Sequence, residues 1–318
     1  MFFEGPEKKI EVIVKNNLLD FSNSFWEKLV ETSGAKILSE VSNLDAKAYL
    51  LSESSLFVWK HHFLMITCGE TTLINSLLYF IDSQGVEDIE SVIFQRKNEY
   101  FSQLQKTTFA EDVKKLKKHL AGQALRFGYL DEHHNFMYHL NHPYQPFPGD
   151  VTTEILMYHI QGVAAEKLRC ENQSLEDIRK LLNLEDILKN FQVDDYLFKP
   201  CGYSLNAINQ KKYITVHITP QEDSSYVSFE TNLNLKKDYP GLCERILNVF
   251  QPFSFDVIDF NTETEVPKSL GARRINHFQD DLACGYQVNF CHYIRPLDKK
   301  EKPVKLLWSD YDELKPLD

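Results

Sequence analysis

Apolar and polar side chains alternate in parts of the first half of the chain, as they do in half-buried β-strands. Residues 9–14 follow this alternation, whereas residues 22–32 carry large apolar side chains at the spacing of one helix face. Three stretches rich in β-branched and aromatic residues follow at 36–42, 47–52 and 55–67, separated by Asn, Asp and Ser. The pattern therefore predicts a strand, a helix and then consecutive antiparallel strands.

The rest of the chain repeats this mixture of short strands and helices. We expect helices at 71–81, 109–120 and 239–249, and one that begins at Ser174, where Asp177 completes a capping-box-like start. We expect strands at 91–96, 151–160, 212–219, 225–232, 252–261 and 285–295, and a hairpin over 125–140 that turns at 131–135. Antiparallel strands with interspersed helices indicate an α+β fold in which helices lie outside packed sheets.

Composition and charge narrow the class of partner. The 318 residues are 43% hydrophobic with a net charge of −11, which permits a large core and argues against nucleic acid or an anionic membrane. A small cationic substrate fits this sign better. We find no apolar run long enough to cross a bilayer and no basic flank before a signal sequence, so we expect a cytoplasmic protein. The six cysteines have no metal-ligand spacing, so we expect reduced thiols and no metal site.

One polar break between two predicted strands carries distinctive chemistry. The segment reads Leu51-Ser52-Glu53-Ser54-Ser55. The Ser54 hydroxyl can attack the carbonyl of Glu53 and convert the amide to an ester. β-Elimination would then cut the chain and leave a dehydroalanine that hydrolyses to a pyruvoyl group. Because this attack needs a distorted peptide, a sharp turn between strands is a suitable place for it.

Several blocks of sequence resemble the eukaryotic-type, pyruvoyl-dependent S-adenosylmethionine decarboxylase proenzymes. They are residues 2–8 (FFEGPEK), 49–55 (YLLSESS), 94–98 (FQRKN), 198–204 (FKPCGYS), 216–220 (VHITP) and 225–232 (SYVSFETN). The resemblance implies one domain over 1–318, folded as a four-layer αββα sandwich of two antiparallel sheets. It also implies two similar halves, about 1–150 and 151–318, and cleavage at Glu53-Ser54 into a β chain of 1–53 and an α chain of 54–318.

The resemblance also implies roles for individual residues. A pyruvoyl group from Ser54 would form a Schiff base with the amine of S-adenosylmethionine and accept the electrons released with CO₂, so no external cofactor is needed. The product would supply spermidine and spermine synthesis. Cys68 would be the proton donor in decarboxylation, and Ser204 and His217 would support self-cleavage. Two acids, Glu4 and Glu7, would also belong to the catalytic site. The substrate-binding residues would be Phe3, Leu51, Phe198 and Gln221.

Other interpretations stay open for the same residues. Taken alone, Ser54 is an ordinary turn serine, Cys68 a buried strand cysteine, and His217 a structural histidine within an apolar alternation. Gln221 stands where the family has a ribose-binding glutamate, with Glu222 only adjacent. This departure leaves two rival functions: a catalytically poor paralogue that regulates an active decarboxylase, and a pyruvoyl decarboxylase of another amino acid.

The sequence says less about the oligomeric state and about activation by a small molecule. A monomer and a homodimer of the β and α chain pairs are both open. Animal members bind putrescine as an activator in a buried charged network, and Glu11 and Glu230 match two of its acids. Ile66 and Gln161 depart from the animal pattern, so we do not expect putrescine activation.

Overall fold

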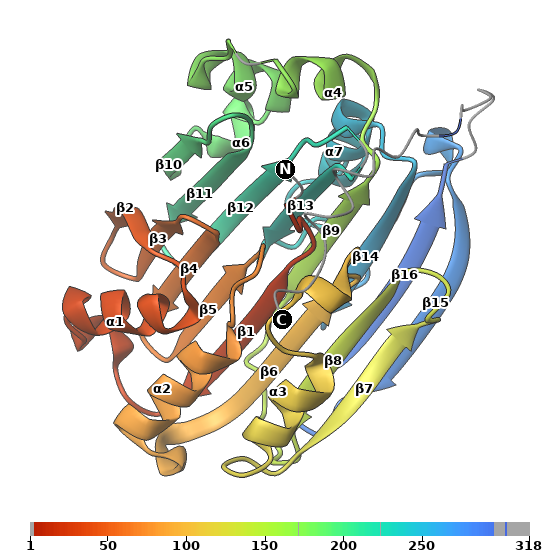
Figure 1. The fold of residues 1–318 in the computed structure, drawn as a ribbon. Helices are drawn as coiled ribbons and strands as arrows, with labels where there is room; N and C mark the ends of the chain where they lie inside the picture. The colour runs from red at the N-terminus through yellow and green to blue at the C-terminus, as the bar shows by residue number, and fades with distance from the viewer. Residues whose placement is uncertain (1–2, 171, 223, 296–302, 304–318) are drawn as a thin grey trace.

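The structure is a computed structural model, which describes residues 3–170, 172–222, 224–295 and 303. Two eight-stranded antiparallel sheets dominate it (Figure 1). The first sheet contains β1 Lys8–Val14, β2 Ile37–Ser42, β3 Ala46–Leu51, β4 Ser54–Trp59, β5 His62–Thr67, β6 Ile89–Lys97, β7 Gly122–Gly128 and β8 His134–Leu140. The second contains β9 Thr152–Tyr158, β10 Gln192–Leu197, β11 Tyr203–Asn209, β12 Lys212–Thr219, β13 Tyr226–Thr231, β14 Ser254–Phe260, β15 Arg273–Asp281 and β16 Gln287–Ile294.

The two sheets have the same strand order. It runs β2-β3-β4-β5-β1-β6-β8-β7 in the first sheet and β10-β11-β12-β13-β9-β14-β16-β15 in the second. Each strand of the second sheet therefore corresponds to the first-sheet strand numbered eight lower. This repeated topology confirms the prediction of two similar halves, although the two sequences show no visible repeat.

Helices accompany each sheet and complete the predicted sandwich. With the first sheet are α1 Asn23–Ser33, α2 Ile74–Gln84 and α3 Phe109–Leu116. With the second are α4 Gly162–Leu168, α5 Leu175–Leu182, α6 Glu185–Leu188 and α7 Leu242–Phe250 (Figure 1). No helix in the described part of the chain is long and apolar enough to cross a bilayer.

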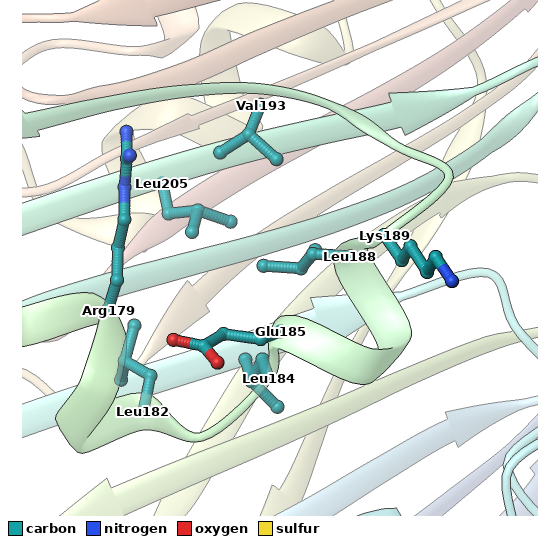
Figure 2. Close-up of a pocket in the computed structure, with 8 residues that line it drawn as sticks. All are labelled: Arg179, Leu182, Leu184, Glu185, Leu188, Lys189, Val193 and Leu205. Carbon is teal, nitrogen blue, oxygen red and sulfur yellow. The ribbon is translucent and has the colours of Figure 1, made fainter. Parts of the chain in front are cut away.

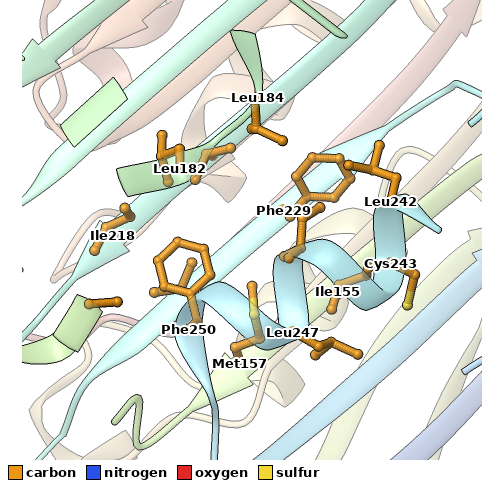
Figure 3. Close-up of a cluster of buried hydrophobic side chains, with 14 of the residues drawn as sticks. Ile155, Met157, Leu182, Leu184, Ile218, Phe229, Leu242, Cys243, Leu247 and Phe250 are labelled. Atoms are coloured by element: carbon orange, nitrogen blue, oxygen red, sulfur yellow. The ribbon is translucent and has the colours of Figure 1, made fainter. Parts of the chain in front are cut away.

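Alternation along the strands assigns side chains to layers. In β1, Ile10, Val12 and Val14 join the core beneath α1 and α2, whereas Ile13 joins an apolar cluster shared by the two sheets. The second sheet forms an equivalent core with its helices, in which Leu247 and Phe250 of α7 lie against strand residues (Figure 3). Lys9 and Glu11 lie on the same face of β1 as Ile13, so the strand directs charge between the sheets.

The structure corrects several predicted boundaries. The stretch 55–67 is not one strand but the hairpin of β4 and β5, and the helix expected over 109–120 ends at Leu116. The sequence pattern missed β10, β11, β15, α4 and α6. The strand β15 is largely exposed and polar, so it lacks the apolar alternation that marks a strand. The strand β11 does alternate, with Tyr203, Leu205 and Ala207 between Ser204 and Asn206, and this signal was overlooked.

Candidate active site

A strained backbone marks the turn that contains Ser54. The strands β3 and β4 are joined by Ser52 and Glu53, and Leu51 pairs directly with Ser54. Ser54 has a φ of 123°, in a region that residues with a side chain rarely adopt. Such a conformation costs on the order of 1–3 kcal/mol and persists only where the surroundings enforce it. Ser54 is also almost fully buried, so the strain lies inside the molecule.

Cys68 lies against both residues of the Glu53-Ser54 peptide. The Ser54 hydroxyl donates to Cys68 Sγ at 3.4 Å. The Cys68 backbone N–H donates to the Glu53 carbonyl oxygen at 3.0 Å, and the thiol lies 3.5 Å from the same oxygen. Burial raises the pKa of the Cys68 thiol, and the Glu53 carboxylate raises it further. The thiol is therefore held protonated beside a carbonyl that already receives an N–H bond.

His217 reaches the neighbouring residue, Ser55, from the opposite sheet. Its Nε2 lies 2.8 Å from Ser55 Oγ, and its Nδ1 lies 2.7 Å from Glu7 Oε1. Ser204 is paired directly with His217 across β11 and β12, so both side chains are on the same face of the sheet. The structure thus brings Glu7, Ser204 and His217 together behind the Ser54 turn, with Ser55 as the residue in contact.

Glu7 is ionised because the Lys97 ammonium group lies beside it and His217 and Ser228 form hydrogen bonds with it. Burial alone would raise its pKa, but Lys97 at 3.2 Å and the hydrogen-bonded His217 lower it to about 2. The hydroxyl of Ser228 also donates to Glu7 Oε1 at 2.6 Å. A carboxylate fixed in this way holds the imidazole in one orientation, as the acid of a catalytic triad does.

A line of buried charges continues from Glu7 between the sheets. Lys97 bridges Glu7 and Glu154, with a distance of 2.8 Å to Glu154. Lys9 lies 2.8 Å from both Glu154 and Glu230. The two lysines come from the first sheet and the last two acids from the second. These opposite charges therefore join the halves of the molecule directly beside the candidate active site.

Two predicted substrate-binding residues, Phe3 and Gln221, contact each other near the turn of Ser52 and Glu53. The Phe3 backbone N–H donates to Gln221 Oε1 at 3.3 Å, and the Ser224 hydroxyl donates to the same oxygen at 2.8 Å. Gly69 has a φ of 64°, and a Cβ placed there would lie 3.0 Å from the Phe3 ring and 3.2 Å from Glu53 Oε2. A side chain at position 69 would therefore strain the backbone and crowd both neighbours.

The side chains of the remaining predicted residues, Glu4, Leu51 and Phe198, form no hydrogen bond or ring contact with Ser54, Cys68 or His217 in the described part of the chain. The Glu4 carboxylate accepts the backbone N–H groups of Tyr100 and Phe101 at 2.8 and 2.9 Å, which anchors that loop. Leu51 is fully buried in the core beneath the helices rather than between the sheets. Phe198 follows β10, and among the described residues its ring contacts Tyr196 and not Phe3.

Comparison with known proteins shows the family to which the chain belongs. A sequence model of the family described as adenosylmethionine decarboxylase matches residues 1–295. The chain belongs to the adenosylmethionine decarboxylase family. Members of this family are carboxy-lyases.

Relatives and a solved structure extend the match. Proteins named S-adenosylmethionine decarboxylase proenzyme from Leishmania donovani and Xenopus laevis are 34% and 32% identical to this chain. The first alignment covers 92% of this chain and 86% of the relative, and the second 80% and 82%. The crystal structure of the Trypanosoma brucei AdoMetDC-delta26 monomer superposes with a TM-score of 0.58 at 26% identity, over 76% of this chain and 99% of that one.

For this member of the decarboxylase family, sequence reasoning missed part of the site. Ser55, Lys9, Lys97 and Glu154 were not selected, although each is almost fully buried. One signal was available: Lys9 stands in a strand whose other residues are mostly apolar, and a buried lysine needs a paired acid. A distinct cavity of about 340 Å³ opens near α5, α6 and β10, and four leucines, one valine and three charged residues line it (Figure 2). Its lining includes none of the candidate active-site residues.

Proposed function

We propose that this chain is a pyruvoyl-dependent S-adenosylmethionine decarboxylase that first cleaves itself between Glu53 and Ser54. The observation that carries the proposal is the positive φ of Ser54 beside a Glu53 carbonyl held by Cys68. The product, decarboxylated S-adenosylmethionine, would serve as the aminopropyl donor in spermidine and spermine synthesis. Family membership and the arrangement of Ser54, Cys68 and His217 support this function over a general pyruvoyl decarboxylase.

Self-cleavage follows from the groups around the turn. Attack of Ser54 Oγ on the Glu53 carbonyl carbon would form an oxyanion on the carbonyl oxygen. The C–N bond then breaks, the hydroxyl proton passes to the released Ser54 amine, and an ester bond joins Glu53 to Ser54 Oγ. The Cys68 N–H already donates to the Glu53 carbonyl oxygen and would stabilise the negative charge, and Ser204 lies beside His217 to donate a further hydrogen bond. Removal of the Ser54 α-proton, the role we propose for His217, expels Glu53 as a carboxylate. The resulting dehydroalanine takes up water and releases ammonia.

The same groups would then serve decarboxylation. A pyruvoyl group at residue 54 supplies an electrophilic carbonyl that binds the substrate amine and takes up the electron pair released with CO₂. Cys68 would return a proton to the substrate carbon, a role supported by burial, which raises the pKa of its thiol. Phe3 would stack on the adenine ring, and Gln221 would face the ribose hydroxyls.

Self-cleavage is tested by the intact mass of the purified protein. We expect two chains, residues 1–53 and 54–318, with the larger one blocked to Edman degradation because its terminus is a ketone. Ser54→Ala should remain one chain and release no CO₂ from S-adenosylmethionine. Ser52→Ala is the matched control, since this turn serine is not the nucleophile, and it should be cleaved. Wild-type protein that stays intact after prolonged incubation would favour the regulatory paralogue.

Substrate choice is tested at Gln221. A carboxylate makes charge-assisted hydrogen bonds that are roughly twice as strong as those of a neutral amide. Gln221→Glu can still accept from Phe3 and Ser224, so we expect it to fold and to lower KM for S-adenosylmethionine several-fold, about 1 kcal/mol, with little change in kcat. Glu222→Gln is the control on the adjacent exposed position. Loss of activity in Gln221→Glu, or wild-type activity on a plain basic amino acid, would indicate a different substrate.

A further inference from the structure

We propose that His133, Asp256 and His292 form a binding site for a divalent transition-metal ion such as Zn²⁺. His133 lies in the turn between β7 and β8, and the other two residues are paired across β14 and β16. The site therefore joins the first sheet to the second. It uses none of the residues assigned to self-cleavage or decarboxylation, so it stands independently of the proposed reaction.

The donor atoms are spaced for a metal ion. One ligand atom from each residue can be chosen so that all lie within 4.8 Å of one another. Asp256 Oδ1 lies 3.2 Å from His133 Nδ1 and 2.8 Å from His292 Nδ1. Ligands about 2.0–2.1 Å from a tetrahedral zinc ion are separated by roughly 3.3 Å. The first distance already matches this separation, and the second needs only a small opening.

Unsatisfied polar atoms around the three residues also indicate a missing ligand. Asp256 is 1% exposed, yet its Oδ2 has no hydrogen-bond partner among the described residues. The hydroxyl of Tyr100, whose ring lies 6.3 Å from that of Tyr158, is buried and likewise lacks a hydrogen-bond partner in the described part of the chain. A hydrogen-bonded His-Asp-His cluster alone would leave Oδ2 unpaired at a cost of about 1–3 kcal/mol. A cation would use this oxygen.

The chemistry of the donors favours a particular class of ion. Two imidazoles and one carboxylate suit Zn²⁺ and its neighbours rather than Mg²⁺ or Ca²⁺, which prefer oxygen ligands throughout. When Nδ1 binds the metal, each neutral imidazole carries its proton on Nε2. For His133 this atom lies 3.5 Å from Ser254 Oγ, which can accept the proton's hydrogen bond.

The residues around the proposed metal site leave a path for an ion to enter, and they connect the site to the layer between the sheets. The side chain of His133 is 17% exposed, so an ion can reach the site from solvent on that side. The ring of Tyr158 lies 4.1 Å from that of His133 and 5.3 Å from that of Tyr226, whose hydroxyl donates to Glu7. An ion at this position would fix the β7–β8 turn against the second sheet, next to the layer that holds Glu7.

Metal binding to the full-length protein tests the site. After treatment with a chelator, the protein is dialysed against Zn²⁺ and its metal content is measured by mass spectrometry. We expect one zinc ion per chain and a raised midpoint of thermal unfolding. His133→Asn and His292→Asn should weaken zinc affinity by at least about tenfold and abolish the thermal shift. His134→Asn, which changes the adjacent histidine at the start of β8 outside the cluster, should behave like wild type.

Cobalt substitution identifies the ligands. With Co²⁺ we expect visible absorption bands typical of nitrogen and oxygen ligands, without the near-ultraviolet band of a cobalt–thiolate bond. Far-ultraviolet circular dichroism checks that each variant is folded. The proposal is overturned if wild type retains no zinc, if His133→Asn binds it as tightly as wild type does, or if the cobalt spectrum shows a thiolate ligand.

Discussion

Cys68→Ala should still cleave itself but decarboxylate S-adenosylmethionine about 10²- to 10⁴-fold more slowly, the usual contribution of a positioned acid. Cleavage should persist because the group that contacts the Glu53 carbonyl most closely is the backbone N–H of residue 68, which alanine keeps. Turnover should fall because the protonated thiol beside Ser54 is lost. Intact mass measures cleavage, and release of labelled CO₂ measures turnover.

Two further variants make this result specific. Cys243→Ala removes another buried cysteine, one on the core-facing side of α7, and should leave turnover unchanged. His217→Ala should give the reverse defect, an uncleaved chain that accumulates an ester between Glu53 and Ser54 and is cut there by hydroxylamine. Normal turnover of Cys68→Ala would exclude the thiol as proton donor. An uncleaved Cys68→Ala chain would instead assign the thiol to the cleavage step.

How much of this molecule can be predicted from sequence depends on whether a feature is local. The helix at 175–182 was predicted from Ser174 and Asp177, and the structure contains the full capping box. The stretches 47–52 and 55–67 predict a break at 53–54, and the structure has this break one residue earlier, at the turn of Ser52 and Glu53 between β3 and β4. Both signals lie within a few neighbouring residues, where propensity and capping act.

Only part of the candidate active site can be predicted from local sequence signals, because its contacts join strands that are distant in sequence. Ser55 and His217 are 162 residues apart in sequence, and Lys9 and Glu230 are 221 apart. The pattern of residues 9–14 predicts a strand and places Lys9 and Glu11 on one face, but it does not say that a second sheet brings carboxylates to that face. Likewise, the positive φ of Ser54 depends on the pairing of β4 with its neighbours rather than on the residue type.

Lys9→Met should destabilise the protein by about 3–5 kcal/mol at neutral pH, because it leaves a buried carboxylate without its cation. Glu154 would still have a cationic partner, Lys97, whose Nζ lies 2.8 Å from its carboxylate. Glu230 is therefore the carboxylate that loses its paired charge. Burial already raises the pKa of Glu230, and Lys9 opposes that shift. Urea unfolding at several pH values measures the effect. Lys28→Met, which removes an exposed lysine paired with Glu31 at 3.5 Å, should cost less than about 1 kcal/mol.

The pH dependence gives this prediction its sign. Without Lys9 the folded-state pKa of Glu230 rises further above its unfolded value, so the folded variant binds a proton more tightly than the unfolded chain does. Its stability relative to wild type should therefore improve as the pH falls from 8 towards about 5. Glu230→Gln combined with Lys9→Met should recover much of the loss at pH 8, since the amide oxygen can still accept from the Tyr213 hydroxyl. Two outcomes would contradict this prediction: a loss of stability in Lys9→Met that does not change with pH, or one that Glu230→Gln does not relieve. Either would mean that lost packing, and not an unpaired buried charge, causes the loss of stability. The charges between the sheets would then contribute little to joining the two halves.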